Sequence, residues 1–179
     1  MTWLALVIDT ETSGLLDNGT LPLQKQPEII EWFSTLVDFD TGEIKSEIDT
    51  LIKPARPVSA EITGITGITN EMLADAPPFS VVADQIREAI EGAPRVIAHN
   101  LSFDREITDL CFRRLDWTIK WPRLICTVEQ TLHLKGFRQN LQGLHEHLFG
   151  ERFAEAHRAR NDVQALVRCC VELRKLGEL

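Results

Sequence analysis

The feature that most constrains the fold is an apolar run at residues 3–8 that ends at two acids, within the stretch LVIDTETSGL. A continuous apolar run of this length is typical of a strand that is buried on both faces of a sheet. Asp9 and Glu11 follow it, and on an extended chain their side chains project to the same face, about 6.6 Å apart along the strand. Two such acids are either solvated side chains at a strand exit or part of a site at the end of a sheet.

Four further strands and several helices are expected after this first strand. Residues 29–38 and 44–52 predict a hairpin with a turn at 40–42, and residues 95–98 and 124–127 predict two shorter strands. Apolar periodicity and capping residues predict helices at 81–90, 100–115, 128–134, 141–149 and along the last segment, with two short helices that begin at Ser59 and Thr69. A hairpin followed by alternating helices and strands indicates an α/β fold, with a mixed five-stranded sheet and helices on both faces.

Length and composition predict a single domain over residues 1–179, without a membrane span. A chain of 179 residues is long enough to bury one sizeable core. No stretch approaches the roughly 18 apolar residues that a membrane-spanning helix needs, and the N-terminus lacks the basic start and cleavage site of a secretion signal. The four cysteines have no C-x-x-C spacing, so we expect reduced thiols and a cytoplasmic protein.

The charge of the chain limits how it can bind nucleic acid. The formal net charge is −8, whereas proteins that contact many phosphates of a long duplex are usually basic. A broad duplex-binding surface is therefore not expected. A small site for the end of a strand stays open, because bound cations can reverse the local sign of the charge.

Two more acidic clusters occur at expected helix starts. The first is HNLSFD, in which Asn100 precedes Asp104 by four residues. It can be explained without a site, with Asn100 as a helix cap and Asp104 at the positive end of the helix dipole. The second is HRARND, which begins at His157 and ends at Asp162. It too has a plain explanation, in which Arg158 and Asp162 form an i,i+4 ion pair and His157 is a surface residue.

Taken together, the three clusters indicate a metal site. Four carboxylates that meet at one end of a sheet repel one another and raise each other's pKa values, and divalent cations remove that cost. Carboxylate oxygens suit Mg²⁺ or Mn²⁺ better than zinc. Two such ions about 3.5–4 Å apart can activate water and stabilise the leaving oxygen of a phosphodiester, and a nearby histidine can accept the water's proton at neutral pH.

The spacings Asp9-x-Glu11, Asn100-x-x-x-Asp104 and His157-x-x-x-x-Asp162 resemble the three motifs of the DnaQ-like (DEDDh) 3′–5′ exonucleases. The resemblance extends over nearly the whole chain and implies an RNase H-like fold. It implies as catalytic residues Asp9, Glu11, Asp104, Asp162 and His157. The four acids would bind two Mg²⁺ or Mn²⁺ ions, and His157 would be the general base. The family has a tyrosine branch and a histidine branch, and this chain contains no tyrosine.

The same resemblance implies contacts to the last nucleotide of a substrate strand. The residues concerned are Thr10, Thr12, Leu15, Glu61, Thr66 and Asn100. Glu61 matches a family glutamate, whereas Thr66 stands where the epsilon-type enzymes have a histidine. Plain alternatives remain for three of them: Glu61 as a first-turn helix acid, Leu15 as a core residue, and Asn100 as a residue that orients the Asp104 loop.

Three functions are compatible with these motifs. The first is a metal-dependent exonuclease that degrades single-stranded DNA from its 3′ end, in proofreading or repair and with a DNA polymerase as a possible partner. The second is the same chemistry on RNA, as in ribonuclease T-like relatives, because no motif here reports contacts to the 2′-hydroxyl. The third is a non-catalytic module that binds a polymerase or a 3′ end, for which one would expect the loss of an acid or of the histidine.

Overall fold

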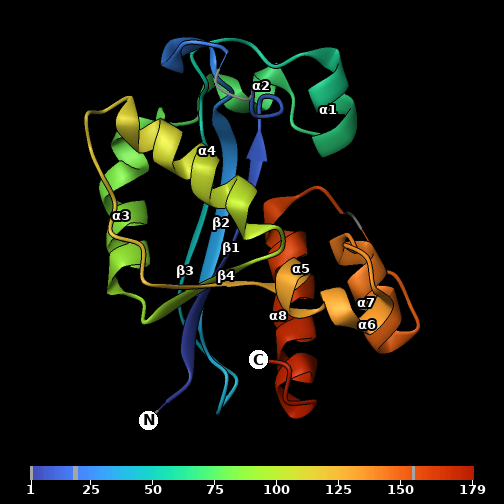
Figure 1. Cartoon of the computed structure of the whole chain (residues 1–179). Helices are drawn as coiled ribbons and strands as arrows, with labels where there is room; N and C mark the ends of the chain where they lie inside the picture. Colours follow the sequence, from blue (N-terminus) through green and yellow to red (C-terminus); the bar gives the residue numbers. More distant parts are fainter. Residues whose placement is uncertain (1, 18–19, 155) are drawn as a thin grey trace.

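The structure, a computed structural model, describes residues 2–17, 20–154 and 156–179. Within these ranges the chain forms a five-stranded sheet in the order β3-β2-β1-β4-β5 (Figure 1). The strands are β1 (Leu4–Thr12), β2 (Ile29–Asp38), β3 (Glu43–Leu51), β4 (Arg95–Ala98) and β5 (Arg123–Cys126). β2 pairs antiparallel with β1 and with β3, whereas β4 pairs parallel with β1 and with β5. The predicted mixed sheet is therefore confirmed, and β1 is its central strand.

The apolar run of β1 is buried on both faces, as its sequence predicts. Leu6 and Ile8 lie in the core between the sheet and the helices of one face, while Ala5 and Val7 lie in the core on the opposite face. Fully burying an aliphatic side chain of this size stabilises a fold by about 1.5–3 kcal/mol. The strand continues to Thr12, four residues beyond the predicted end, because its pairing with β2 continues through the two acids.

Helices cover both faces of the sheet (Figure 1). On one face lie α3 (Phe79–Gly92) and α4 (Leu101–Arg113), and on the other lie α7 (Leu141–Phe149) and α8 (Ala159–Lys175). The apolar stripe predicted for the last helix is present, since Val163, Leu166 and Leu173 are buried against the sheet. The helix α8 packs on β1 and β2, which places its first turn beside the end of β1.

Short helices connect these elements. Ser59 Oγ accepts the Ile62 N–H before α1 (Ala60–Thr66), and Thr69 Oγ1 accepts the Met72 N–H before α2 (Asn70–Ala74), as the capping pattern predicts. A 3₁₀ turn, η1 (Leu23–Lys25), lies between β1 and β2. The prediction of a single helix at 128–134 is wrong. This stretch forms two short helices, α5 (Thr127–Gln130) and α6 (Leu132–Lys135). They are separate because Thr131 leaves the helical conformation, and its hydroxyl donates to the Thr127 carbonyl.

Two expectations from composition concern the chain as a whole. In the described part of the chain, every helix is too short or too polar to cross a membrane. The four cysteines are all unpaired thiols, and Cys111, Cys169 and Cys170 are buried.

Candidate active site

The acids Asp9 and Glu11 lie at the end of β1 that faces the start of α8. Because side chains alternate along a strand, both point to the same face as Val7, which packs against α8. One carboxylate oxygen from each lies within 4.8 Å of an oxygen of Asp162, the acid in the first turn of α8. Residues far apart in sequence therefore form one acidic cluster, as predicted.

Asp104 approaches the cluster from the first turn of α4. Its side chain is 3% exposed, and its Oδ1 accepts a hydrogen bond from Thr10 Oγ1 at 2.9 Å. Burial raises the pKa of Asp104 to about 7. Burial also raises the pKa of Asp9 well above its ordinary value, and the charges of Asp104 and Asp162 raise it further. Asp104 thus belongs electrostatically to the same cluster, and the hydroxyl of Thr10 orients it.

The third predicted motif enters the site through an unusual backbone turn. His157 has a φ of 68°, in the left-handed region that non-glycine residues rarely occupy. Asp162 Oδ2 accepts the backbone N–H groups of His157 at 2.8 Å and Arg158 at 3.1 Å. Burial nevertheless raises the pKa of Asp162 to about 6. The His157 side chain is exposed, at the entrance to α8.

The plain alternative for this motif, an ion pair between Arg158 and Asp162, is wrong. Asp162 turns its carboxylate to the backbone, and the Arg158 guanidinium binds Glu31 of β2 instead, at 2.7 Å. Glu31 is directly opposite Glu11 in the antiparallel register and is only 3% exposed. The sequence analysis missed this residue. The available signal was an acid within the otherwise apolar stretch that begins β2.

Burial and mutual repulsion disfavour the ionised form of the clustered carboxyls. Burial raises the pKa of Glu11 to about 8, and the charges of Asp162 and Glu31 contribute to this shift. A divalent cation favours ionised carboxylates and removes this penalty. The donor set consists of carboxylate oxygens, which Mg²⁺ and Mn²⁺ prefer. Asp9, Glu11 and Asp162 can therefore hold a metal ion, with Asp104 beside them.

The histidine and asparagine of the second motif have different roles. His99 bonds through Nδ1 with Thr127 Oγ1 at 2.9 Å and through Nε2 with the Gln139 carbonyl at 3.0 Å. Burial lowers the pKa of His99 to about 4, so this residue is a neutral structural tie between β4 and the loop before α7. Asn100 precedes α4 in the left-handed conformation, and its side chain makes no capping bond. Instead its Oδ1 accepts from Arg138 Nη2 at 3.1 Å, so the capping alternative is wrong.

The other residues expected to contact a nucleotide lie on two neighbouring segments. Leu15 is 87% exposed, which excludes the core alternative for it. The Thr12 hydroxyl donates to the Gly14 carbonyl at 2.8 Å and shapes the loop that carries Leu15. Glu61 lies in the first turn of α1. Thr66, the last residue of α1, is 5% exposed, and its hydroxyl donates to the Ile62 carbonyl at 3.0 Å.

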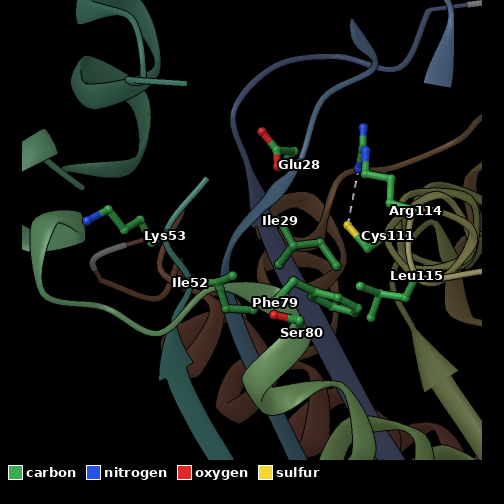
Figure 2. Close-up of a pocket in the computed structure, with 9 residues that line it drawn as sticks. All are labelled: Glu28, Ile29, Ile52, Lys53, Phe79, Ser80, Cys111, Arg114 and Leu115. Carbon is green, nitrogen blue, oxygen red and sulfur yellow. Dashed lines mark hydrogen bonds between the residues drawn. The ribbon is translucent and has the colours of Figure 1, made fainter. Parts of the chain in front are cut away.

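A separate small hollow of about 140 Å³ lies between β2, α3 and α4 (Figure 2). Its floor is apolar, with Ile29 and Phe79 among its residues, and Arg114 stands at its rim. Arg114 Nη2 donates to the carbonyls of Leu23, Gln26 and Pro27, which ties the segment after β1 to α4. None of the clustered acids lines this hollow, and we assign it a structural role.

A mixed sheet in this order, with carboxylates from three segments gathered at the end of its central strand, defines the class of nucleases with an RNase H-like fold. A family model described as "Exonuclease" (RNase_T) matches residues 6–169. The chain therefore belongs to the DnaQ-like (DEDDh) exonuclease family, which confirms the resemblance of its motifs.

Relatives and solved structures agree with this assignment. The chain is 33% identical over 148 residues to the DNA polymerase III epsilon subunits of Pasteurella multocida and Haemophilus influenzae, a match that covers 80% of this chain and 56% of each relative. The chain thus spans little more than half the length of these relatives. Exonuclease X, solved in complex with 5′ overhanging duplex DNA, superposes with a TM-score of 0.69 at 25% identity, over 97% of this chain and 93% of that one. The nuclease domain of 3′hExo bound to rAMP has a TM-score of 0.78 at 18% identity, over 98% and 94% of the two chains, and supports the fold alone.

Proposed function

We propose that this chain is a metal-dependent 3′–5′ exonuclease that hydrolyses phosphodiester bonds at the 3′ end of single-stranded DNA. The observation that carries the proposal is the convergence of Asp9, Glu11 and Asp162, whose oxygens lie within 4.8 Å of one another, with Asp104 held beside them by Thr10. In a purely structural group of acids, each carboxylate would be paired with a lysine or arginine side chain. Here, in contrast, burial raises the pKa values of all four carboxyls.

The four acids would hold two Mg²⁺ or Mn²⁺ ions. When bound, such ions lower the pKa of water and stabilise the charge that develops on the oxygens of a phosphodiester. The chain itself contributes the rigidity of the site. Asp9 and Glu11 are placed by β1, which pairs with β2 along its whole length and with β4 at Leu6 and Val7, and Asp104 is oriented by the Thr10 hydroxyl.

His157 would be the general base of the reaction. A solvent-exposed imidazole is a side chain that can accept a proton from water in such a reaction. The backbone N–H of His157 donates to Asp162 at 2.8 Å, so one carboxylate would bind metal and also fix the turn that carries the base.

The last nucleotide of the substrate would bind next to this site, between the loop that follows β1 and α1. Leu15, with 87% of its side chain exposed, would contact the base or sugar of that nucleotide. The backbone at Thr10 and Thr12, the Glu61 carboxylate, Thr66 and Asn100 would be the other contacts.

We favour DNA as the substrate. The relatives named as DNA polymerase III epsilon subunits are 33% identical to this chain, whereas 3′hExo, solved with rAMP, is 18% identical. Exonuclease X was solved with DNA. The PolC-type DNA polymerase III of Staphylococcus aureus matches 97% of this chain at 28% identity, so a DNA polymerase is the partner we propose, with proofreading or repair as the process. A cytoplasmic location and a single domain over residues 1–179 remain predictions of the sequence.

The test uses 5′-labelled single-stranded DNA and RNA of one sequence, with Mg²⁺ or Mn²⁺ and then with EDTA. We expect a ladder that shortens from the 3′ end, that requires the metal, and that forms faster on DNA. Asp9→Asn is the matched inactive control. Faster loss of RNA would make the chain an exoribonuclease, and no cleavage of either strand by the purified chain would favour the non-catalytic binding module.

A further inference from the structure

A buried carboxylate outside the four expected metal ligands holds the start of α8. Both oxygens of Glu31 are used: Oε1 accepts from Arg158 Nη2 at 2.7 Å and Nε at 3.1 Å, and Oε2 accepts the backbone N–H of Ala159 at 2.9 Å. Glu31 lies on the central part of the sheet, in β2, whereas Arg158 and Ala159 begin α8. A single side chain therefore fastens both the side chain and the backbone of the α8 entrance.

Three successive amides at this entrance are fixed by two carboxylates. Asp162 accepts the N–H groups of His157 and Arg158, and Glu31 accepts the N–H of Ala159. His157 is also held at a φ of 68°. A non-glycine residue in this region is strained and persists only where its surroundings determine its conformation. The contacts of Glu31 with Arg158 and Ala159 help to fix this conformation, because they hold the following two residues against the sheet.

The charge of Glu31 would be unfavourable here if it had no such role. It stands opposite Glu11 in the strand register and adds a fifth acid to a cluster that already contains four. The ion pair with Arg158 offsets part of this charge, and both oxygens of Glu31 are bound by protein donors. An apolar side chain at position 31 could accept neither the Ala159 N–H nor the Arg158 guanidinium.

We propose that Glu31 and Arg158 form a positioning pair that sets the place of His157 and Asp162 relative to Asp9 and Glu11. Neither residue touches the reacting atoms. They act through the α8 entrance, which carries the proposed base and one proposed metal ligand. The expected effect on kcat rests on the proposed exonuclease function. The positioning of residues 157–159 can be tested without any substrate.

The same helix offers a matched control. Arg160, two residues further on, pairs with Asp49 of β3 at 2.7 Å and so also ties the first turn of α8 to the sheet. That pair is exposed, with 43% and 42% of its side chains accessible, and it contacts neither Glu31 nor the clustered acids. Arg160→Met therefore removes an arginine–carboxylate pair from the first turn of α8 but leaves the hydrogen bonds of residues 157–159 in place.

The activity experiment is a double-mutant cycle with Glu31→Gln, Arg158→Met and both together, on a 5′-labelled single-stranded oligonucleotide with Mn²⁺. We expect kcat to fall about 100-fold in either single variant, the effect of a displacement of about 1 Å, with KM changed less than about threefold. The double variant should be no slower than Arg158→Met, because the two residues act as one unit. Arg158→Lys, which keeps the charge but loses the bidentate geometry, should lie between wild type and Arg158→Met.

Hydrogen exchange of the substrate-free protein gives the readout that does not depend on activity. The amides of residues 157–159 should exchange faster in Glu31→Gln than in wild type, while amides of β1 stay unchanged, and Arg160→Met should leave both sets unchanged. Unchanged kcat in folded Glu31→Gln and Arg158→Lys would overturn the proposal. So would a rise in KM alone, which would make Arg158 a substrate contact, or losses that multiply in the double variant. If wild type does not cleave at all, the proposed function fails, and the exchange rates still decide whether the pair positions α8.

Discussion

The acidic cluster predicts that the metal-free protein loses stability as the pH rises. The pKa of Glu11 is raised from 4.5 to about 8 and that of Asp104 from 3.8 to about 7 in the folded protein. Between the ordinary and the raised pKa values, the folded state holds protons that the unfolded chain has released. Stability therefore falls with rising pH in that window, since its slope follows the number of protons bound by the unfolded state minus that bound by the folded state.

The clearest window is pH 6.5 to 8. Below it, His99 acts in the opposite direction, because its folded-state pKa is lowered from 6.5 to about 4. Across the window, a single fully shifted carboxyl such as Glu11 changes the free energy of unfolding by about 2 kcal/mol. Partial exposure of Glu11 reduces its share to about 1 kcal/mol, and Asp104 adds to this up to its own pKa near 7. A total of about 1–2 kcal/mol corresponds to a fall in Tm of roughly 2–8 °C for a chain of this size.

The assay is thermal unfolding followed by circular dichroism at several pH values, once with EDTA and once with Mn²⁺. We expect the fall in Tm with EDTA only, because bound cations favour the ionised carboxyls, so that the stabilisation by metal grows with pH. Glu11→Gln is the control and should flatten the dependence in EDTA. A metal-free Tm that stays constant or rises from pH 6.5 to 8, or an equal slope in Glu11→Gln, would refute the reasoning.

Three further predictions concern single residues. Asp9→Asn should lower cleavage about a thousandfold or more, the loss of roughly 4 kcal/mol of charge stabilisation, while it raises the metal-free Tm because it relieves repulsion; gel assays and melting curves check both. His99→Gln should lessen the loss of stability between pH 6.5 and 4 by about 2 kcal/mol after screening by solvent, seen as a lower midpoint in acid titration. Asn140→Ala removes the acceptor of the Gly143 N–H at 2.8 Å before α7 and should cost about 1 kcal/mol, or roughly 2–4 °C in Tm.

The parts of the fold that sequence could predict are those with a strong local signal. The bounds of β2 and α7 agree with their patterns, since both are limited by clear turn or capping residues. The end of β1 was predicted too early, because the pattern records the loss of apolar residues, while the strand is continued by hydrogen bonds to β2. The break at Thr131 was missed for a similar reason, since a hydroxyl that binds the preceding turn leaves no trace in the periodicity.

The acids of the site were found because three motifs repeat the same chemistry, but their partners were not. An i,i+4 spacing predicted that Arg158 would meet Asp162, and nothing local shows that a carboxylate on a distant strand competes for the arginine. Glu31 and Arg158 are 127 residues apart in sequence, and they meet only because α8 packs on the sheet. Contacts of this kind depend on tertiary structure, which a single sequence does not report.

The central place of β1 has a consequence for how such a site can be altered. Asp9 and Glu11 lie in the antiparallel register of β1 with β2, opposite Phe33 and Glu31, so a shift of that backbone must break ladder hydrogen bonds to β2. Two of the proposed ligands are thus on a fixed backbone, and the spacing between their oxygens depends on side-chain length and rotamer. Exchange of aspartate and glutamate at positions 9 and 11 is therefore the adjustment through which a chain of this kind could come to prefer a smaller or a larger cation.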